Sequence, residues 1–131
     1  MARIQILVAD DNDAVLGEIR ELLGEEFEII GTVSNGQDAV EAVLRFDPDV
    51  VVLDMAMPIL DGIQAASRIR ESNARTKILF LTIQENPDYV SAAFAAGATG
   101  YITKRRLLSD LAYAIREVAE GGTFLSSTLR K

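Results

Sequence analysis

Short apolar runs alternate along the chain with longer segments in which apolar residues recur at helical spacing. The runs are rich in Val, Ile and Leu and lie at residues 4–9, 28–33, 49–53, 77–82 and 99–102. Stretches such as VVVL and ILFL have no polar alternation. That is typical of central strands in a parallel sheet, which are buried on both faces. The pattern therefore predicts five parallel strands.

A helix-periodic segment follows each run. The first has Asp13 as its predicted N-cap, and the second stops at Asp47-Pro48. The fourth opens with Asn86-Pro87, a cap followed by a first-turn proline, and closes at Gly97. Strands and helices that alternate in this way predict an α/β doubly wound fold, with a five-stranded parallel sheet covered on both faces. We expect one domain over 1–121 and the start of a linker or a C-terminal tail over 122–131.

Composition narrows the chemistry that this domain can perform. Its 131 residues include no cysteine and no histidine, which excludes disulfides, thiolate metal sites and an imidazole base. The net charge of −7 argues against the domain alone holding a nucleic acid backbone. The N-terminal apolar run is too short for a signal peptide and no stretch approaches membrane-spanning length, so we expect a cytoplasmic protein with no membrane partner.

Polar residues stand where the predicted strands end. Asp10 and Asp11 follow the first strand, Asp54 the third and Lys104 the fifth, while Thr82 ends the fourth. In an open parallel sheet ligands bind at the carboxyl ends of the strands, so we expect these five residues to converge. Each has an ordinary explanation when taken alone, such as a helix cap, a turn or a surface lysine. None of those explanations predicts all five at one edge.

The convergence predicts a particular chemistry. Three carboxylates in one crevice repel one another until a proton or a cation relieves the repulsion. A few carboxylates with several waters are typical of a Mg²⁺ site. A carboxylate such as Asp54, beside a metal ion, the Lys104 ammonium and the Thr82 hydroxyl, can attack phosphorus and form an aspartyl-phosphate.

The chain resembles a response-regulator receiver domain of two-component signalling over nearly its whole length. Four motifs that carry the resemblance occur in order: VADD at 8–11, LDMAMPILDG at 53–62, LT at 81–82 and YITK at 101–104. The resemblance implies a flavodoxin-like (βα)5 fold with strand order 2-1-3-4-5. The final part, LLSDLAYAIREVAEGGTFLSS, is similar to the subfamily whose receiver precedes a LuxR-type helix-turn-helix domain.

The resemblance also implies roles for individual residues. Asp54 would be the phosphoacceptor, and Asp10 and Asp11 would bind Mg²⁺ with the backbone carbonyl of Ala56. Thr82 and Lys104 would contact the phosphoryl group. Tyr101 is similar to the family's switch aromatic, which turns inward as Thr82 moves toward the phosphate.

The same resemblance implies partners. A sensor histidine kinase would donate the phosphoryl group, and the domain would form a homodimer weakly or only on phosphorylation. Phosphorylation would alter the face formed by the fourth helix, fifth strand and fifth helix. That change would control transcription through a DNA-binding output domain absent from this chain. We therefore expect a piece of a longer regulator.

Three other functions compete with this interpretation. A haloacid-dehalogenase-like phosphatase would need a second aspartate two residues beyond Asp54, and Ala56 stands there. This argues against a turnover enzyme. A flavin or nucleotide binder would want a glycine- or hydroxyl-rich loop after the first strand, where the anionic ADDNDA would repel phosphate. A degenerate receiver that only contacts proteins would not need the full set of five residues.

Overall fold

Six parallel strands form one sheet in the computed structural model, which describes residues 3–73 and 75–129. The strands are β1 (Gln5–Ala9), β2 (Glu28–Val33), β3 (Val50–Leu53), β4 (Lys77–Thr82), β5 (Gly100–Thr103) and β6 (Phe124–Leu125). Their order across the sheet is β2-β1-β3-β4-β5-β6, so the predicted order 2-1-3-4-5 is confirmed. β1, β3 and β5 each begin one residue later than the apolar runs predict.

The predicted count of five strands is one short. β6 lies within residues 122–131, the predicted linker or tail, and pairs in parallel with β5 through Phe124 and Leu125. A strand of two residues gives neither an apolar run nor an alternation that a sequence pattern could detect. Its pairing satisfies backbone groups of β5 that would otherwise be unpaired at the edge of the sheet.

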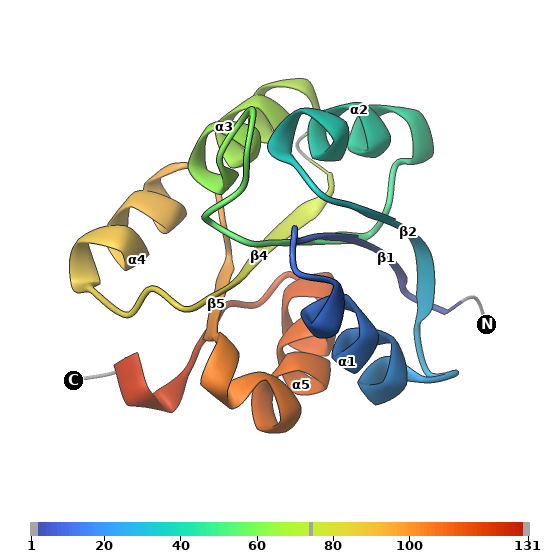
Figure 1. The fold of residues 1–131 in the computed structure, drawn as a ribbon, viewed down its shortest axis with the longest axis vertical. Coiled ribbons are helices and arrows are strands. Elements are labelled where there is room, and N and C mark those ends of the chain that lie inside the picture. The colour runs from blue at the N-terminus through green and yellow to red at the C-terminus, as the bar shows by residue number, and fades with distance from the viewer. Residues whose placement is uncertain (1–2, 74, 130–131) are drawn as a thin grey trace.

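The helices cover the sheet on both faces. They are α1 (Asp13–Leu23), α2 (Gly36–Phe46), α3 (Gly62–Ser72), α4 (Pro87–Ala95) and α5 (Leu107–Ala119), with 3₁₀ turns η1 (Lys104–Arg106) and η2 (Ser127–Leu129). Figure 1 shows α1 and α5 on one face and α2, α3 and α4 on the other. Within the described residues, none of the helices has the length and apolar character that a bilayer crossing requires.

The sheet separates two hydrophobic cores, which explains why its central strands lack polar alternation. Val50 and Val52 of β3 point into the core beneath α1 and α5, whereas Val51 and Leu53 point into the core beneath α2, α3 and α4. All four side chains are buried. The rigid double-sided packing fixes the position at which β3 ends, one residue before Asp54.

Helix caps agree with the sequence in two cases and differ in one. Asn86 caps α4 ahead of Pro87, and Asp47 ends α2 in a left-handed conformation with φ of 48°. α1, however, is capped by Asn12, whose side chain accepts hydrogen bonds from the backbone N–H groups of Ala14 and Val15. The prediction of Asp13 as N-cap is therefore wrong, because both residues are good caps and only the backbone conformation selects between them.

Candidate functional site

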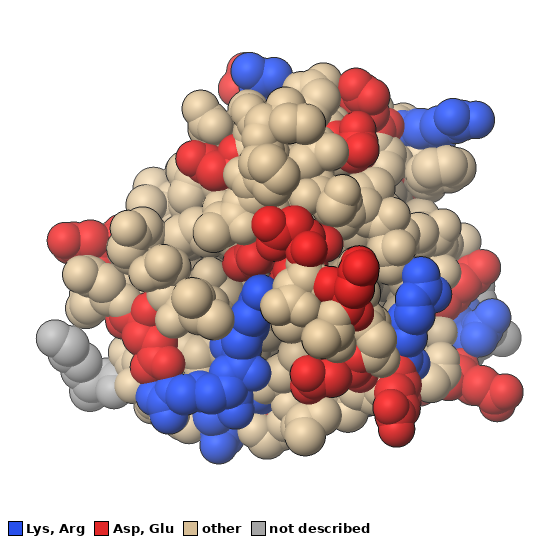
Figure 2. Space-filling view, viewed as in Figure 1, with Lys and Arg blue, Asp and Glu red and all other residues tan. Residues whose placement is uncertain are grey.

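The carboxyl ends of the central strands meet at one edge of the sheet. Asp10 follows β1, Asp54 follows β3, Thr82 ends β4 and Lys104 begins η1 directly after β5. Figure 2 shows acidic side chains gathered near where β1 leads into α1 in Figure 1, with Lys and Arg side chains beside them. Strand order reverses between β1 and β3, and this is the point at which doubly wound sheets bind ligands.

Three carboxylates are clustered at this edge. Asp10, Asp11 and Asp54 each offer an oxygen, and these oxygens lie within 4.8 Å of one another. Asp10 and Asp54 are only 2% and 6% exposed, whereas Asp11 faces solvent. Ionised carboxylates that are buried need hydrogen-bond donors or cations. The oxygens of Asp10 and Asp54 therefore need donors or cations nearby.

Backbone donors hold one oxygen of each buried carboxylate. The Met55 N–H donates to Asp54 Oδ1 at 2.7 Å, and the Asn12 N–H donates to Asp10 Oδ1 at 2.8 Å. The other oxygen of each faces Lys104, whose Nζ lies 2.9 Å from Asp10 Oδ2 and 3.3 Å from Asp54 Oδ2. The ammonium thus bridges the two carboxylates and fixes both side chains.

The charges at this edge do not balance. Burial and the negative charge of Asp10 raise the pKa of Asp54 above its usual value, against the charge and hydrogen bond of Lys104 and the Met55 N–H. Burial lowers the pKa of Lys104, but the hydrogen bond to Asp10 and the charges of Asp54 and Asp10 outweigh it, so that pKa is raised overall. The cluster holds three carboxylates, and the Lys104 ammonium contacts two of them, Asp10 and Asp54. The excess negative charge favours a cation.

The donor set fits Mg²⁺. Hard carboxylate oxygens, one of them on the exposed Asp11, suit an ion that keeps several waters and uses few protein ligands. Ala56, whose backbone carbonyl is the predicted further ligand, lies exposed in the loop between β3 and α3. This loop is held by the Gly62 N–H, which donates to the Met55 carbonyl at 2.9 Å.

Tyr101 points into the molecule from β5. Its side chain is fully buried, its hydroxyl donates to the Gln84 carbonyl at 2.7 Å, and its ring centroid lies 6.2 Å from that of Phe80. Burial, followed by the charges of Glu85, Asp54 and Tyr89, raises the pKa of Tyr101 to about 12, so the hydroxyl keeps its proton. This hydrogen bond joins β5 to the loop that follows Thr82.

The response regulator receiver domain model matches residues 6–116, which is most of the chain. The chain belongs to this family. It is 44% identical over 100 residues to chemotaxis protein CheY of Halobacterium salinarum, covering 76% of this chain and 83% of CheY. It is 37% identical over 120 residues to transcriptional regulatory protein DesR of Bacillus subtilis, covering 90% of this chain but only 59% of DesR.

The fold of this receiver also matches solved structures. A LuxR-family two-component response regulator from Aurantimonas sp. SI85-9A1 superposes with a TM-score of 0.92 at 27% identity, covering 98% of this chain and 93% of the other. The resemblance to LuxR-family receivers, predicted from the motifs, is confirmed. The receiver spans roughly half to two thirds of the transcriptional regulators that it matches.

Two side-chain contacts near the receiver's acidic edge were not predicted from the sequence. Arg105 donates two hydrogen bonds to Glu85, at 2.6 and 2.8 Å, and so ties η1 to the loop after β4. Ser126, in the predicted tail, is fully buried and bonded to Asp110. Their spacings of 20 and 16 residues correspond to no local period, so no sequence signal pointed to either pair.

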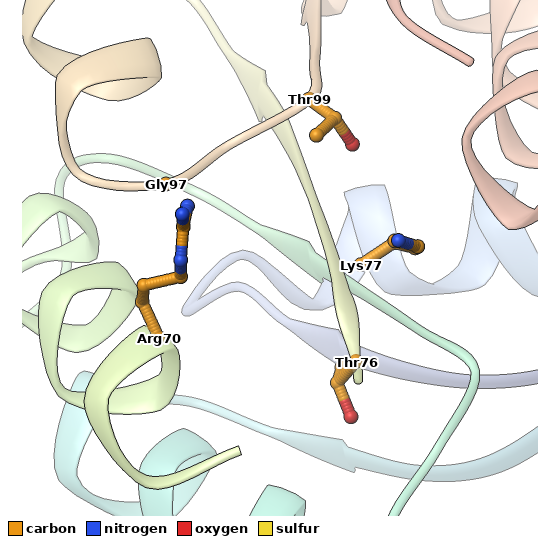
Figure 3. A pocket seen from close by; sticks show the side chains of 5 residues that line it. All are labelled: Arg70, Thr76, Lys77, Gly97 and Thr99. Atoms are coloured by element: carbon orange, nitrogen blue, oxygen red, sulfur yellow. The ribbon is translucent and has the colours of Figure 1, made fainter. Parts of the chain in front are cut away.

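A polar cavity of about 240 Å³ lies at the opposite edge of the sheet, lined by Arg70, Thr76, Lys77, Gly97 and Thr99. Figure 3 shows Arg70 reaching toward Gly97 on one side of β4 and Lys77 extending on the other. Lys77 precedes Ile78, whose side chain lies in the core beneath α3, so the lysine belongs to the other face. The two cations therefore do not converge, and the acidic edge is the candidate site.

Proposed function

We propose that this receiver is a phosphorylation-dependent signalling switch. In this proposal Asp54 accepts a phosphoryl group from a sensor histidine kinase, with Mg²⁺ bound by Asp10, Asp11, Asp54 and the backbone carbonyl of Ala56. The observation that supports it best is the Lys104 ammonium bridging two buried carboxylates at 2.9 and 3.3 Å. The charge and hydrogen bond of Lys104 favour the ionised form of Asp54 against burial and the charge of Asp10. The excess negative charge of the site favours the divalent cation that would assist this nucleophile.

Each residue has a defined part in the transfer. A carboxylate oxygen of Asp54 forms a bond to phosphorus while the bond from phosphorus to the kinase's imidazole nitrogen breaks. The electron pair of that bond stays on the nitrogen, and the product is an aspartyl-phosphate. Lys104 Nζ and the Thr82 hydroxyl donate to phosphoryl oxygens. Mg²⁺, when bound, neutralises charge on those oxygens.

The phosphoryl group changes the charge at the site by about −1.5 to −2 near neutral pH. In our proposal Thr82 and Lys104 move toward this charge, and the face formed by α4, β5 and α5 repacks around Tyr101. A switch of this kind needs two conformations whose balance the local charge shifts. The hydrogen bond from Tyr101 to Gln84 belongs to one of them.

The transcriptional regulators among the relatives suggest what the switch controls. DesR is a transcriptional regulator by name and extends well beyond the matched region. We propose that this receiver controls a DNA-binding output domain outside the present chain, and that it pairs as a homodimer on phosphorylation. Ala56 supplies no acid for turnover, which argues against a phosphatase.

The test uses beryllofluoride, a mimic of the phosphoryl group. We expect it to perturb amide resonances of residues 82–104 in the wild type only when Mg²⁺ is present, and to leave Asp54→Asn unchanged. The asparagine is nearly isosteric with the aspartate and matches it apart from the charge. No perturbation in the wild type would contradict the proposal and indicate a receiver that retains its fold without its chemistry.

A further inference from the structure

The last described residues lie along the edge of β5 opposite β4. The Phe124 N–H donates to the Thr99 carbonyl at 3.0 Å, and the Ser126 N–H donates to the Tyr101 carbonyl at 3.1 Å. We call residues 124–129, which comprise β6 and η2, the C-terminal segment. The strand that this segment covers is the one that holds Tyr101 and leads into Lys104.

Ser126 connects the C-terminal segment to the turn that begins with Lys104. Its buried hydroxyl donates to Asp110 Oδ2 at 2.9 Å and accepts a hydrogen bond from the Thr103 N–H at 3.4 Å. Asp110, only 7% exposed, also accepts from Arg106 at 3.2 Å. Thr103 immediately precedes Lys104 and Arg106 ends η1. The Ser126–Asp110 pair therefore holds the turn at both ends.

Undocking of the segment would disturb this network. The Thr103 N–H would lose its acceptor, and Asp110 would lose one of its two donors. Polar groups that stay buried without a partner destabilise the fold, so the surroundings would have to rearrange. That rearrangement would occur in the backbone on either side of Lys104.

The C-terminal segment also fills the space beside Tyr101. Leu125 is paired with Tyr101 across the two strands, and partners in a parallel ladder point to the same face of the sheet. Leu125 and Leu129 pack against the core cluster that contains the Tyr101 ring. The docked segment thus favours the inward position of the ring.

We infer that docking of the C-terminal segment on β5 is coupled to the phosphorylation site. The docked segment holds Tyr101 inward and η1 in place, and so raises the affinity of the site for a phosphoryl group. By thermodynamic reciprocity, a phosphoryl group on Asp54 strengthens the docking of the segment. The inference rests on the proposed function. It adds to the α4-β5-α5 face a second part of the receiver that responds to phosphorylation, namely the backbone that follows α5.

The first measurement is hydrogen exchange on the wild type. The Phe124 and Ser126 amides report docking directly, because both donate to β5. We expect beryllofluoride with Mg²⁺ to slow their exchange by about five-fold or more, the lower end of typical coupling between sites.

The second measurement compares the affinities of two serine variants for beryllofluoride. Ser126→Ala removes the buried hydroxyl, whereas the matched control Ser127→Ala removes an exposed one. We expect Ser126→Ala to bind about five-fold more weakly or worse, and Ser127→Ala to bind as the wild type does.

The outcomes separate the two proposals. No binding of beryllofluoride to the wild type would overturn the proposed function and the coupling together. Binding with unchanged exchange at Phe124 and Ser126, and with equal affinities in both serine variants, would overturn the coupling alone. The exchange experiment needs no variant, so a loss of folding in Ser126→Ala would not prevent a decision.

Discussion

A substitution of Gly62 tests how closely the loop after Asp54 packs against the start of α3. It begins α3, and a Cβ added there would lie 2.2 Å from the Asp54 carbonyl oxygen and 2.8 Å from the Met55 Cα. The distance from the added Cβ to the Asp54 oxygen is more than 1 Å shorter than 3.4 Å, the lower limit of ordinary van der Waals contact. Both atoms belong to the backbone of the phosphoacceptor loop, so no side-chain rotation can relieve the overlap.

We expect Gly62→Ala to destabilise the receiver by about 2 kcal/mol. Overpacking typically costs about 1–3 kcal/mol, and contact with backbone atoms places this site at the upper end of that range. The helix preference of alanine returns at most about 1 kcal/mol. Because the Asp54 backbone must shift to make room, we also expect weaker binding of beryllofluoride.

The matched control is Gly17→Ala in α1, where an added Cβ meets nothing within 4 Å. That variant should be more stable than the wild type by up to about 1 kcal/mol, because alanine is favoured in an exposed helix. Urea unfolding followed by circular dichroism measures both changes. A Gly62→Ala protein that unfolds at the wild-type midpoint and binds beryllofluoride normally would refute the close packing of this loop.

Three further predictions concern the charges and the hydrogen bond of the site. Because the folded-state pKa of Asp54 is raised, its ionisation costs stability as pH rises above its usual value of 3.8. Asp54→Asn should therefore be more stable than the wild type at pH 7. In urea unfolding this difference should vanish as the pH falls below 3.8, because Asp54 is then protonated in both the folded and the unfolded protein. Tyr101→Phe removes the hydrogen bond to Gln84 and should lose about 1 kcal/mol in the same assay. Mg²⁺ should raise the thermal midpoint of the wild type, with about 2.7 kcal/mol of stabilisation at about 100 times its Kd.

Each of these predictions has a control. Tyr113→Phe alters a half-exposed tyrosine and should change stability by no more than about 0.5 kcal/mol. Equal losses in the two tyrosine variants would contradict the importance of the Gln84 contact. Asp54→Asn with wild-type stability at every pH would contradict the raised pKa. Asp11→Asn should weaken the response to Mg²⁺, and an unchanged response would remove Asp11 from the metal site.

Much of the acidic edge could be predicted from the sequence because parallel sheets impose a simple geometry. Residues that end the strands must lie at one edge, so Asp10, Asp54, Thr82 and Lys104 converge wherever the strands are correctly placed. The unbroken VVVL run and the Asn86-Pro87 cap are local signals of the same kind, decided by period and by a few neighbouring residues. These features follow from the chain alone.

The partners of each polar atom were decided only by the tertiary structure. Nothing in the sequence shows that Lys104 bridges Asp10 and Asp54. The bridge depends on where η1 places the Lys104 ammonium relative to the two carboxylates. In the sequence Ser126 is one residue of a polar tail, and only the free edge of β5 and the buried Asp110 give it a place in the fold. Sequence determines what repeats along the chain, whereas contacts between distant residues depend on packing, which has no period along the chain.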